Sequence, residues 1–152
     1  MGCSNKCGKT CHDKSCQRFY NNNAQALAAG ATLQLQIAGT KVVDSGISIE
    51  TEPNNFTTVK TGLYHIAGDV SITPTAGGTV TFQVYMDGVA LPCTLRTITL
   101  PATGSREIHT ETDLCLSGCC CDVSHTFTFQ LTSVDTAAGS VIQSCFGILK
   151  LA

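Results

Sequence analysis

The fold is decided by the stretch TGLYHIAGDVSITPTAGGTVTFQVYMDGVALP, residues 61–92, where apolar and polar side chains alternate in two successive runs. Successive side chains of an extended chain point to opposite faces, so this period of two indicates half-buried β-strands. The first run places on one face Tyr64, Ile66, Gly68, Val70 and Ile72, and on the other Leu63, His65, Ala67, Asp69 and Ser71. A turn-rich link with Pro74, Gly77 and Gly78 follows. In the second run, the side chains on one face are Val80, Phe82, Val84 and Met86.

The second run ends at Asp87-Gly88, a dipeptide that is typical of tight two-residue hairpins. We therefore expect a central antiparallel hairpin within residues 61–92 and the start of another strand at Val89. Similar patterns predict further strands near 31–38, 41–50, 55–60, 90–100, 106–115, 123–133 and 141–151. Strands of this spacing, separated by turn residues, predict an all-β protein: an antiparallel jelly-roll sandwich of about 8–10 strands with an extended N-terminal arm.

The order of these segments resembles the head domains of the tumour-necrosis-factor and complement globular-head superfamily. The resemblance rests on Thr-Gly-Leu-Tyr at 61–64, Val-Thr-Phe-Gln-Val-Tyr at 80–85 and the Asp-Gly that follows, and it covers roughly residues 24–152. It is nearest in style to the small versions found on bacterial exosporium glycoproteins and on phage virions. The resemblance implies a jelly roll that commonly trimerises, and it carries over no catalytic residue.

Composition argues against several classes of partner. The net charge is −2 and only 13% of the residues are charged, so the chain lacks the basic surface that binds nucleic acid or an anionic membrane. We find no apolar run long enough to span a bilayer, and no apolar segment of a secretory signal follows Met1. An extracellular location would therefore be reached by lysis or by assembly in a mother cell.

The chain divides by composition into two parts. Residues 1–23 are polar and rich in cysteine, and they contain too few apolar side chains to fold alone, so we expect a flexible arm. Residues 24–152 are long enough to form one domain with its own core.

The ten cysteines are concentrated in the arm and in the loop LCLSGCCC at 114–121. A domain of this size does not need disulfide bonds to fold, and a disulfide between adjacent cysteines is strained. We therefore expect disulfides between subunits. The candidates are Cys3, Cys7, Cys11, Cys16, Cys115, Cys119, Cys120 and Cys121.

Zinc is the competing interpretation of the cysteines, because Cys3, Cys7, Cys11, His12 and Cys16 include enough soft ligands for a tetrahedral site. The arm lacks the paired Cys-x2-Cys units of the usual zinc modules, which favours disulfides. A third alternative is that the thiols remain reduced.

The last predicted strand, 141–151, is apolar on both faces, whereas a strand buried on one face alone alternates with polar residues. We expect its second face, with Ile142, Phe146 and Ile148, to contact another subunit. The alternative is that loops or the arm cover this face.

The sequence carries no nucleophile elbow, phosphate loop, zinc-protease motif or dinucleotide fingerprint, so we do not expect an enzyme. His109, Glu111 and Asp113 alternate onto one strand face, and His65 and Asp69 share another. The first set could hold a cation on a subunit axis, but ordinary histidine–carboxylate neighbours on a polar face are the simpler interpretation.

These features predict a non-enzymatic structural subunit that self-assembles, as a trimer or a filament, on the exterior of a spore or a virion and is cross-linked through its arm. One alternative is a trimeric phage decoration or head protein that binds a receptor or glycan on a host surface. A second is a zinc-binding intracellular domain. The sequence predicts no cofactor in the favoured case, and neither nucleic acid nor membrane as a partner.

Overall fold

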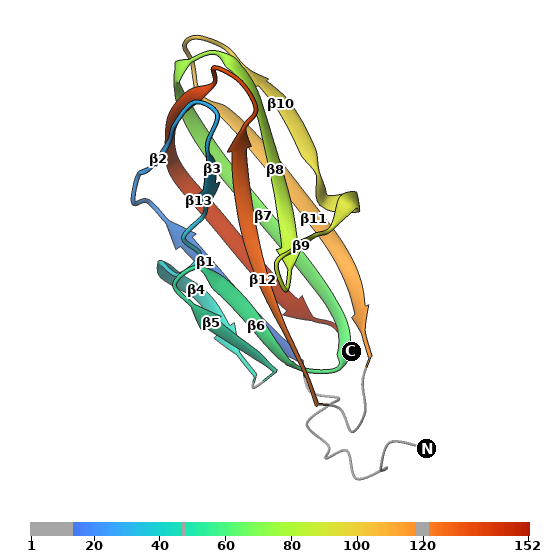
Figure 1. The fold of residues 1–152 in the computed structure, drawn as a ribbon. Helices are drawn as coiled ribbons and strands as arrows, with labels where there is room; N and C mark the ends of the chain where they lie inside the picture. The colour runs from blue at the N-terminus through green and yellow to red at the C-terminus, as the bar shows by residue number, and fades with distance from the viewer. Residues whose placement is uncertain (1–13, 47, 118–121) are drawn as a thin grey trace.

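The computed structural model describes residues 14–46, 48–117 and 122–152 and shows two antiparallel β-sheets that form a sandwich (Figure 1). The first, sheet A, has the spatial order β11 (Arg106–Leu116), β7 (Gly62–Ala76), β13 (Ala138–Lys150), β1 (Ser15–Asn21) and β4 (Thr40–Ser45), with β2 (Gln25–Leu27) paired to β13. The second, sheet B, has the order β10 (Arg96–Leu100), β8 (Gly78–Met86), β12 (Asp122–Ser133), β6 (Asn55–Lys60) and β5 (Ile49–Glu52), with β3 (Thr32–Gln34) paired to β12 and β9 (Val89–Ala90) to β8. The predicted all-β jelly-roll sandwich is confirmed.

The central stretch has the predicted alternation but not the predicted pairing. The inward positions of β7 and β8 are buried, from Tyr64 to Ile72 and from Val80 to Val84. However, β7 pairs with β11 and β13 in sheet A, whereas β8 pairs with β10 and β12 in sheet B. The expected hairpin is therefore wrong, because the chain crosses from one sheet to the other at Gly77. Two apolar strand faces can be buried side by side or across a sandwich, and the local pattern is the same in both cases.

The turn at Asp87-Gly88 is confirmed. Both residues have positive φ, 52° and 80°, as a type I′ turn requires, and they join β8 to β9 with Tyr85 opposite Ala90. The Asp87 carboxylate also accepts a hydrogen bond from the backbone N–H of Thr126, at 2.8 Å. This bond ties the turn to β12.

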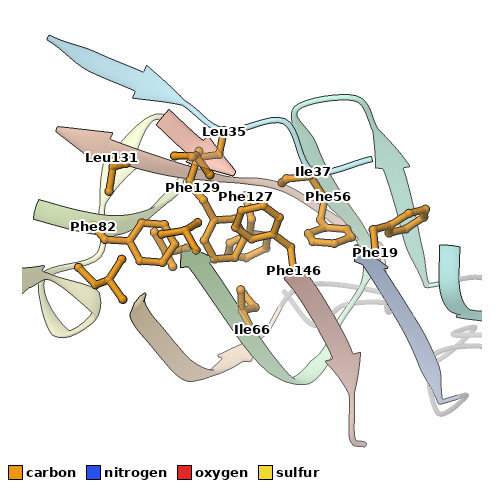
Figure 2. Close-up of a cluster of buried hydrophobic side chains, with 14 of the residues drawn as sticks. Phe19, Leu35, Ile37, Phe56, Ile66, Phe82, Phe127, Phe129, Leu131 and Phe146 are labelled. Atoms are coloured by element: carbon orange, nitrogen blue, oxygen red, sulfur yellow. The ribbon is translucent and has the colours of Figure 1, made fainter. Parts of the chain in front are cut away.

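Aromatic side chains from both sheets meet in the core (Figure 2). The ring of Phe129 on β12 has its centroid 4.6 Å from that of Phe146 on β13 and 5.9 Å from that of Phe82 on β8. Gly68 on β7 lies beneath this group, and a Cβ atom there would be 2.6 Å from the Phe129 ring. The two sheets therefore pack closely at this point because Gly68 has no side chain.

Part of the segment that the sequence assigned to the arm belongs to the sandwich. Residues 15–21 form β1, which lies between β13 and β4 in sheet A. Its Phe19 side chain is buried and packs against Phe56, with ring centroids 6.3 Å apart. The domain therefore begins before residue 24, and only residues 1–13 of the expected arm lie outside the described part of the chain.

Several predicted strands are shorter or divided. The strand expected at 41–50 is two strands, β4 and β5, which lie in different sheets. The strand expected at 90–100 is interrupted by a single 3-10 turn, η2 (Pro92–Thr94). Within the described residues, no helix has the length and apolar character needed to cross a membrane.

Candidate functional site

The last strand, β13, does not expose the face that its sequence indicated. Phe146 and Ile148 are buried in the core, at 0% and 1% exposure, so these two predicted interface residues are wrong. An irregularity between Val141 and Gln143 shifts the register, and it leaves Ile142 exposed at 42%. A bulge of this kind adds one residue and reverses which side chains point inward beyond it.

The outward face of β13 instead carries Cys145, Gly147 and Leu149, at the centre of the outer face of sheet A. An open groove of about 290 Å³ lies over this face and is lined by residues of β1, β7, β11 and β13, among them Cys16, Arg18, His65, Ala67, Asp69, His109, Cys145, Gly147 and Leu149. The outer face of sheet B is more polar, because its strands β8 and β12 present there, besides Tyr85, the residues Thr81, Gln83, Thr126, Thr128, Gln130 and Thr132. The outer face of sheet A is therefore our candidate site.

A row of imidazoles and carboxylates, which we call the histidine ladder, crosses this face. It consists of Asp113, His65, Glu111, His109 and Asp69 in that order, from the adjacent strands β11 and β7. Each imidazole has its Nδ1 atom 2.6 Å from an aspartate oxygen, Asp113 for His65 and Asp69 for His109. Both Nε2 atoms face the same oxygen of Glu111, at 3.5 and 3.3 Å.

The protonation state decides how many ladder contacts are hydrogen bonds. An ionised carboxylate only accepts, so each Nδ1 must carry the proton that is donated to an aspartate. In the neutral imidazole the Nε2 atom then has a lone pair, which faces the Glu111 oxygen. Glu111 therefore accepts from both imidazoles only when both are protonated.

The surroundings of His109 favour its charged form. Partial burial opposes the charge, but the hydrogen bond and charge of Asp69, followed by those of Glu111, outweigh burial and raise the pKa of His109 above its ordinary value of 6.5. The His109 side chain is 48% exposed and that of Glu111 is 54% exposed, so water screens these interactions in the isolated chain.

A second contact on this face joins β1 and β13. The Arg18 Nε atom lies 3.3 Å from the Cys145 sulfur. This hydrogen bond and the neighbouring thiol raise the pKa of Arg18 against a smaller opposing effect of burial. This pair could not be predicted from the sequence, because the sequence does not reveal that β1 lies beside β13.

The cysteine candidates are only partly described. Of the eight candidates, Cys16 and Cys115 belong to the described residues, where they and two further cysteines, Cys93 and Cys145, form no disulfide with one another. The other six candidates lie outside the described residues, namely Cys3, Cys7, Cys11, Cys119, Cys120 and Cys121. In the part of the chain that the structure describes, no group of three or more His, Cys, Asp or Glu side chains has a metal-holding arrangement. His109, Glu111 and Asp113, which the sequence placed on one strand face, all belong to the histidine ladder.

The described residues that flank both cysteine-rich segments lie at one end of the sandwich. Ser15 is opposite Lys150 at the start of β1, Leu116 is opposite Gly62 at the end of β11, and Asp122 begins β12 opposite Lys60. The chain end is also there, because the Leu63 backbone N–H donates to the Ala152 carbonyl at 2.9 Å (Figure 1). We call this the cysteine end.

Comparisons with known proteins identify the fold. No family model and no curated protein matches the sequence. Among solved structures, murine APRIL superposes with a TM-score of 0.64 at 14% identity, over 91% of this chain and 100% of that chain.

The globular domain of zebrafish complement 1qA gives a TM-score of 0.63 at 10% identity, over 91% of this chain and 98% of its own. Eiger TNF from S. frugiperda gives 0.62 at 12% identity, over 91% of this chain and 92% of its own. Identities this low establish shared architecture only. The chain has a jelly-roll fold of the tumour-necrosis-factor and complement 1q head type.

Proposed function

We propose that this protein is a non-enzymatic structural subunit that forms a homo-oligomer, a trimer in the first instance, through the outer face of sheet A. The observation that carries the proposal is the contrast between the two outer faces. Sheet A presents a groove with the small or apolar residues Ala67, Gly147 and Leu149 at its centre, and sheet B presents a row of threonines and glutamines beside Tyr85. A flat apolar centre with a charged surround is typical of a protein–protein contact.

The cysteine-rich segments would cross-link this assembly. In a closed cyclic oligomer every copy presents the same end on the same side of the ring. The cysteine end of each subunit would then lie beside that of its neighbour, so the arm of one copy could reach the loop of the next. Disulfides persist in oxidising surroundings, which fits the exterior of a spore or a virion.

Two measurements test the two parts of this proposal. For the covalent part, thiols are blocked at lysis and the mass is measured under denaturing conditions with and without reductant. We expect multimers that collapse to the 15.9 kDa chain only on reduction. A monomer in both cases would contradict cross-linking and would direct the next experiment to metal analysis.

For the non-covalent part, sedimentation velocity in the presence of reductant compares Ala67→Arg with Thr128→Arg. The first places a long cation at the centre of the outer face of sheet A, and the second places the same side chain on the central strand of sheet B. We expect Ala67→Arg to be monomeric and Thr128→Arg to assemble like the wild type. Loss of assembly in Thr128→Arg alone would assign the interface to sheet B.

A further inference from the structure

The histidine ladder crosses the face that the proposed function covers with a second copy of the chain, and its charge depends on pH in the physiological range. When both imidazoles are neutral, the three carboxylates of the ladder outnumber the one nearby cation, the guanidinium of Arg18, so that two negative charges are uncompensated. When both are protonated, their two charges and the guanidinium of Arg18, which lines the same groove from β1, balance the three carboxylates. The net charge of the ladder and Arg18 together therefore changes from −2 to zero when both imidazoles take up protons.

The difference in charge affects association only if the ladder is buried at the contact between subunits. In the isolated chain the ladder side chains are 35–64% exposed, so water screens their charges. A second copy placed over the face would remove that water, and uncompensated charges are costly to bury. In a cyclic oligomer that turns this face of every copy toward its neighbours, the unprotonated ladders of the copies would also repel one another.

We propose that self-association through the outer face of sheet A takes up protons at His65 and His109, so that the assembly tightens as the pH falls from about 8 to about 6. This inference rests on the proposed function. The imidazoles supply the added protons, Glu111 accepts both new hydrogen bonds through its single facing oxygen, and Asp69 and Asp113 hold the rings in place.

The other titratable or charged groups on this face leave the direction unchanged. Glu107, on the same strand as His109, accepts a hydrogen bond from Ser71 at 3.4 Å and adds one negative charge whether or not the ladder is protonated. Arg18 is a cation throughout and lies against the Cys145 thiol, and Cys16 lines the same groove. Partial burial opposes the charge of His109, but Asp69 and Glu111 outweigh burial and raise the pKa of His109 above its ordinary value, which favours the protonated form on this face.

The test measures the association constant by sedimentation velocity over a concentration series between pH 5.5 and 8.5, with reductant present so that only non-covalent contacts count. For each proton taken up on association, the constant should rise by up to about tenfold per pH unit of acidification. The double variant His65→Gln/His109→Gln should lose this dependence. His125→Gln is the matched control, because His125 pairs with Asp87 at 2.6 Å on sheet B, away from this face.

Glu111→Gln is a second variant that leaves both imidazoles in place. It should associate more tightly than wild type at pH 8 and show a weaker pH dependence, because it removes the charge that the protons compensate. An oligomer whose association constant is independent of pH, or a double variant that keeps the wild-type dependence, would overturn this inference and leave the proposed function standing. A wild-type chain that is monomeric at every pH and concentration would overturn both.

Discussion

The close packing around Gly68, which has no side chain, predicts how much stability the core would lose if a methyl group were added there. A methyl group at this position would lie 2.6 and 2.8 Å from two carbons of the Phe129 ring and 3.0 Å from a carbon of Phe146. Both rings are fully buried and in contact with each other, so they have little room to move. Overpacking of this kind costs about 1–3 kcal/mol, so we expect Gly68→Ala to lower the free energy of unfolding by this amount.

The assay is urea unfolding under reducing conditions, at a concentration where both variants have the same oligomeric state. Gly147→Ala is the matched control, because Gly147 lies in the adjacent strand on the opposite face and its nearest neighbour to a new methyl is 3.7 Å away. We expect Gly147→Ala to leave the free energy of unfolding unchanged or to raise it by about 0.4–1 kcal/mol, because alanine lowers the conformational entropy of the unfolded chain.

A third variant checks the cause of the effect. Phe129→Leu replaces the ring that the new methyl strikes, so the double variant Gly68→Ala/Phe129→Leu should be more stable than the sum of the single changes predicts. If Gly68→Ala is as stable as Gly147→Ala, the close packing of the two sheets at this point is refuted.

Two further predictions concern hydrogen bonds at the edge of sheet B. The buried Thr94 hydroxyl donates to the Leu91 carbonyl at 2.6 Å and accepts from the Val84 backbone N–H at 3.0 Å. Thr94→Val should therefore lower the free energy of unfolding in urea by about 1–3 kcal/mol. A loss smaller than that of Thr97→Val, at an exposed position, would contradict this role. At Asp87 partial burial opposes ionisation, but the hydrogen bonds from His125 and from the Thr126 backbone N–H outweigh it and lower the pKa below the ordinary 3.8. The ionised Asp87 carboxylate stabilises the fold above pH 3.8, and this stabilisation is lost as the pH falls through the pKa of Asp87 in the folded protein. Asp87→Asn should therefore flatten the acid side of the pH–stability profile, measured as urea midpoints between about pH 2 and 5. A variant with the wild-type profile would contradict this role of Asp87.

The sequence was informative where apolar periodicity is strong. The inward rows of β7, β8 and β12 follow the alternation, and the Asp87-Gly88 turn follows from its dipeptide. The strand β1 was missed for a physical reason: of its inward residues only Phe19 is a large apolar side chain, and Ser15, Gln17 and Asn21 are polar. These polar groups form buried bonds, such as that from Gln17 Nε2 to the Ile49 carbonyl at 2.9 Å, which no hydrophobic pattern reveals.

The candidate site was predictable only in pieces. Alternation placed His109, Glu111 and Asp113 on one strand face and His65 and Asp69 on another, and both placements are correct. Their union in one ladder depends on β11 lying beside β7, which is a long-range pairing. The error at Phe146 and Ile148 has a different cause, because a single extra residue in β13 reverses the side-chain faces beyond it.

The cysteine end gives the subunit a polarity. At the opposite end lie the connections between β7 and β8, between β10 and β11, and between β12 and β13, since Ala76 is opposite Ala138 and Gly78 is opposite Leu100. If cross-links anchor one end, these connections, together with residues 28–31 between β2 and β3, form the end of each subunit that points away from the anchorage. A foreign epitope inserted at 102–104 would then be displayed outward in a fixed orientation, whereas the same epitope fused at Ala152 would be placed among the cross-links.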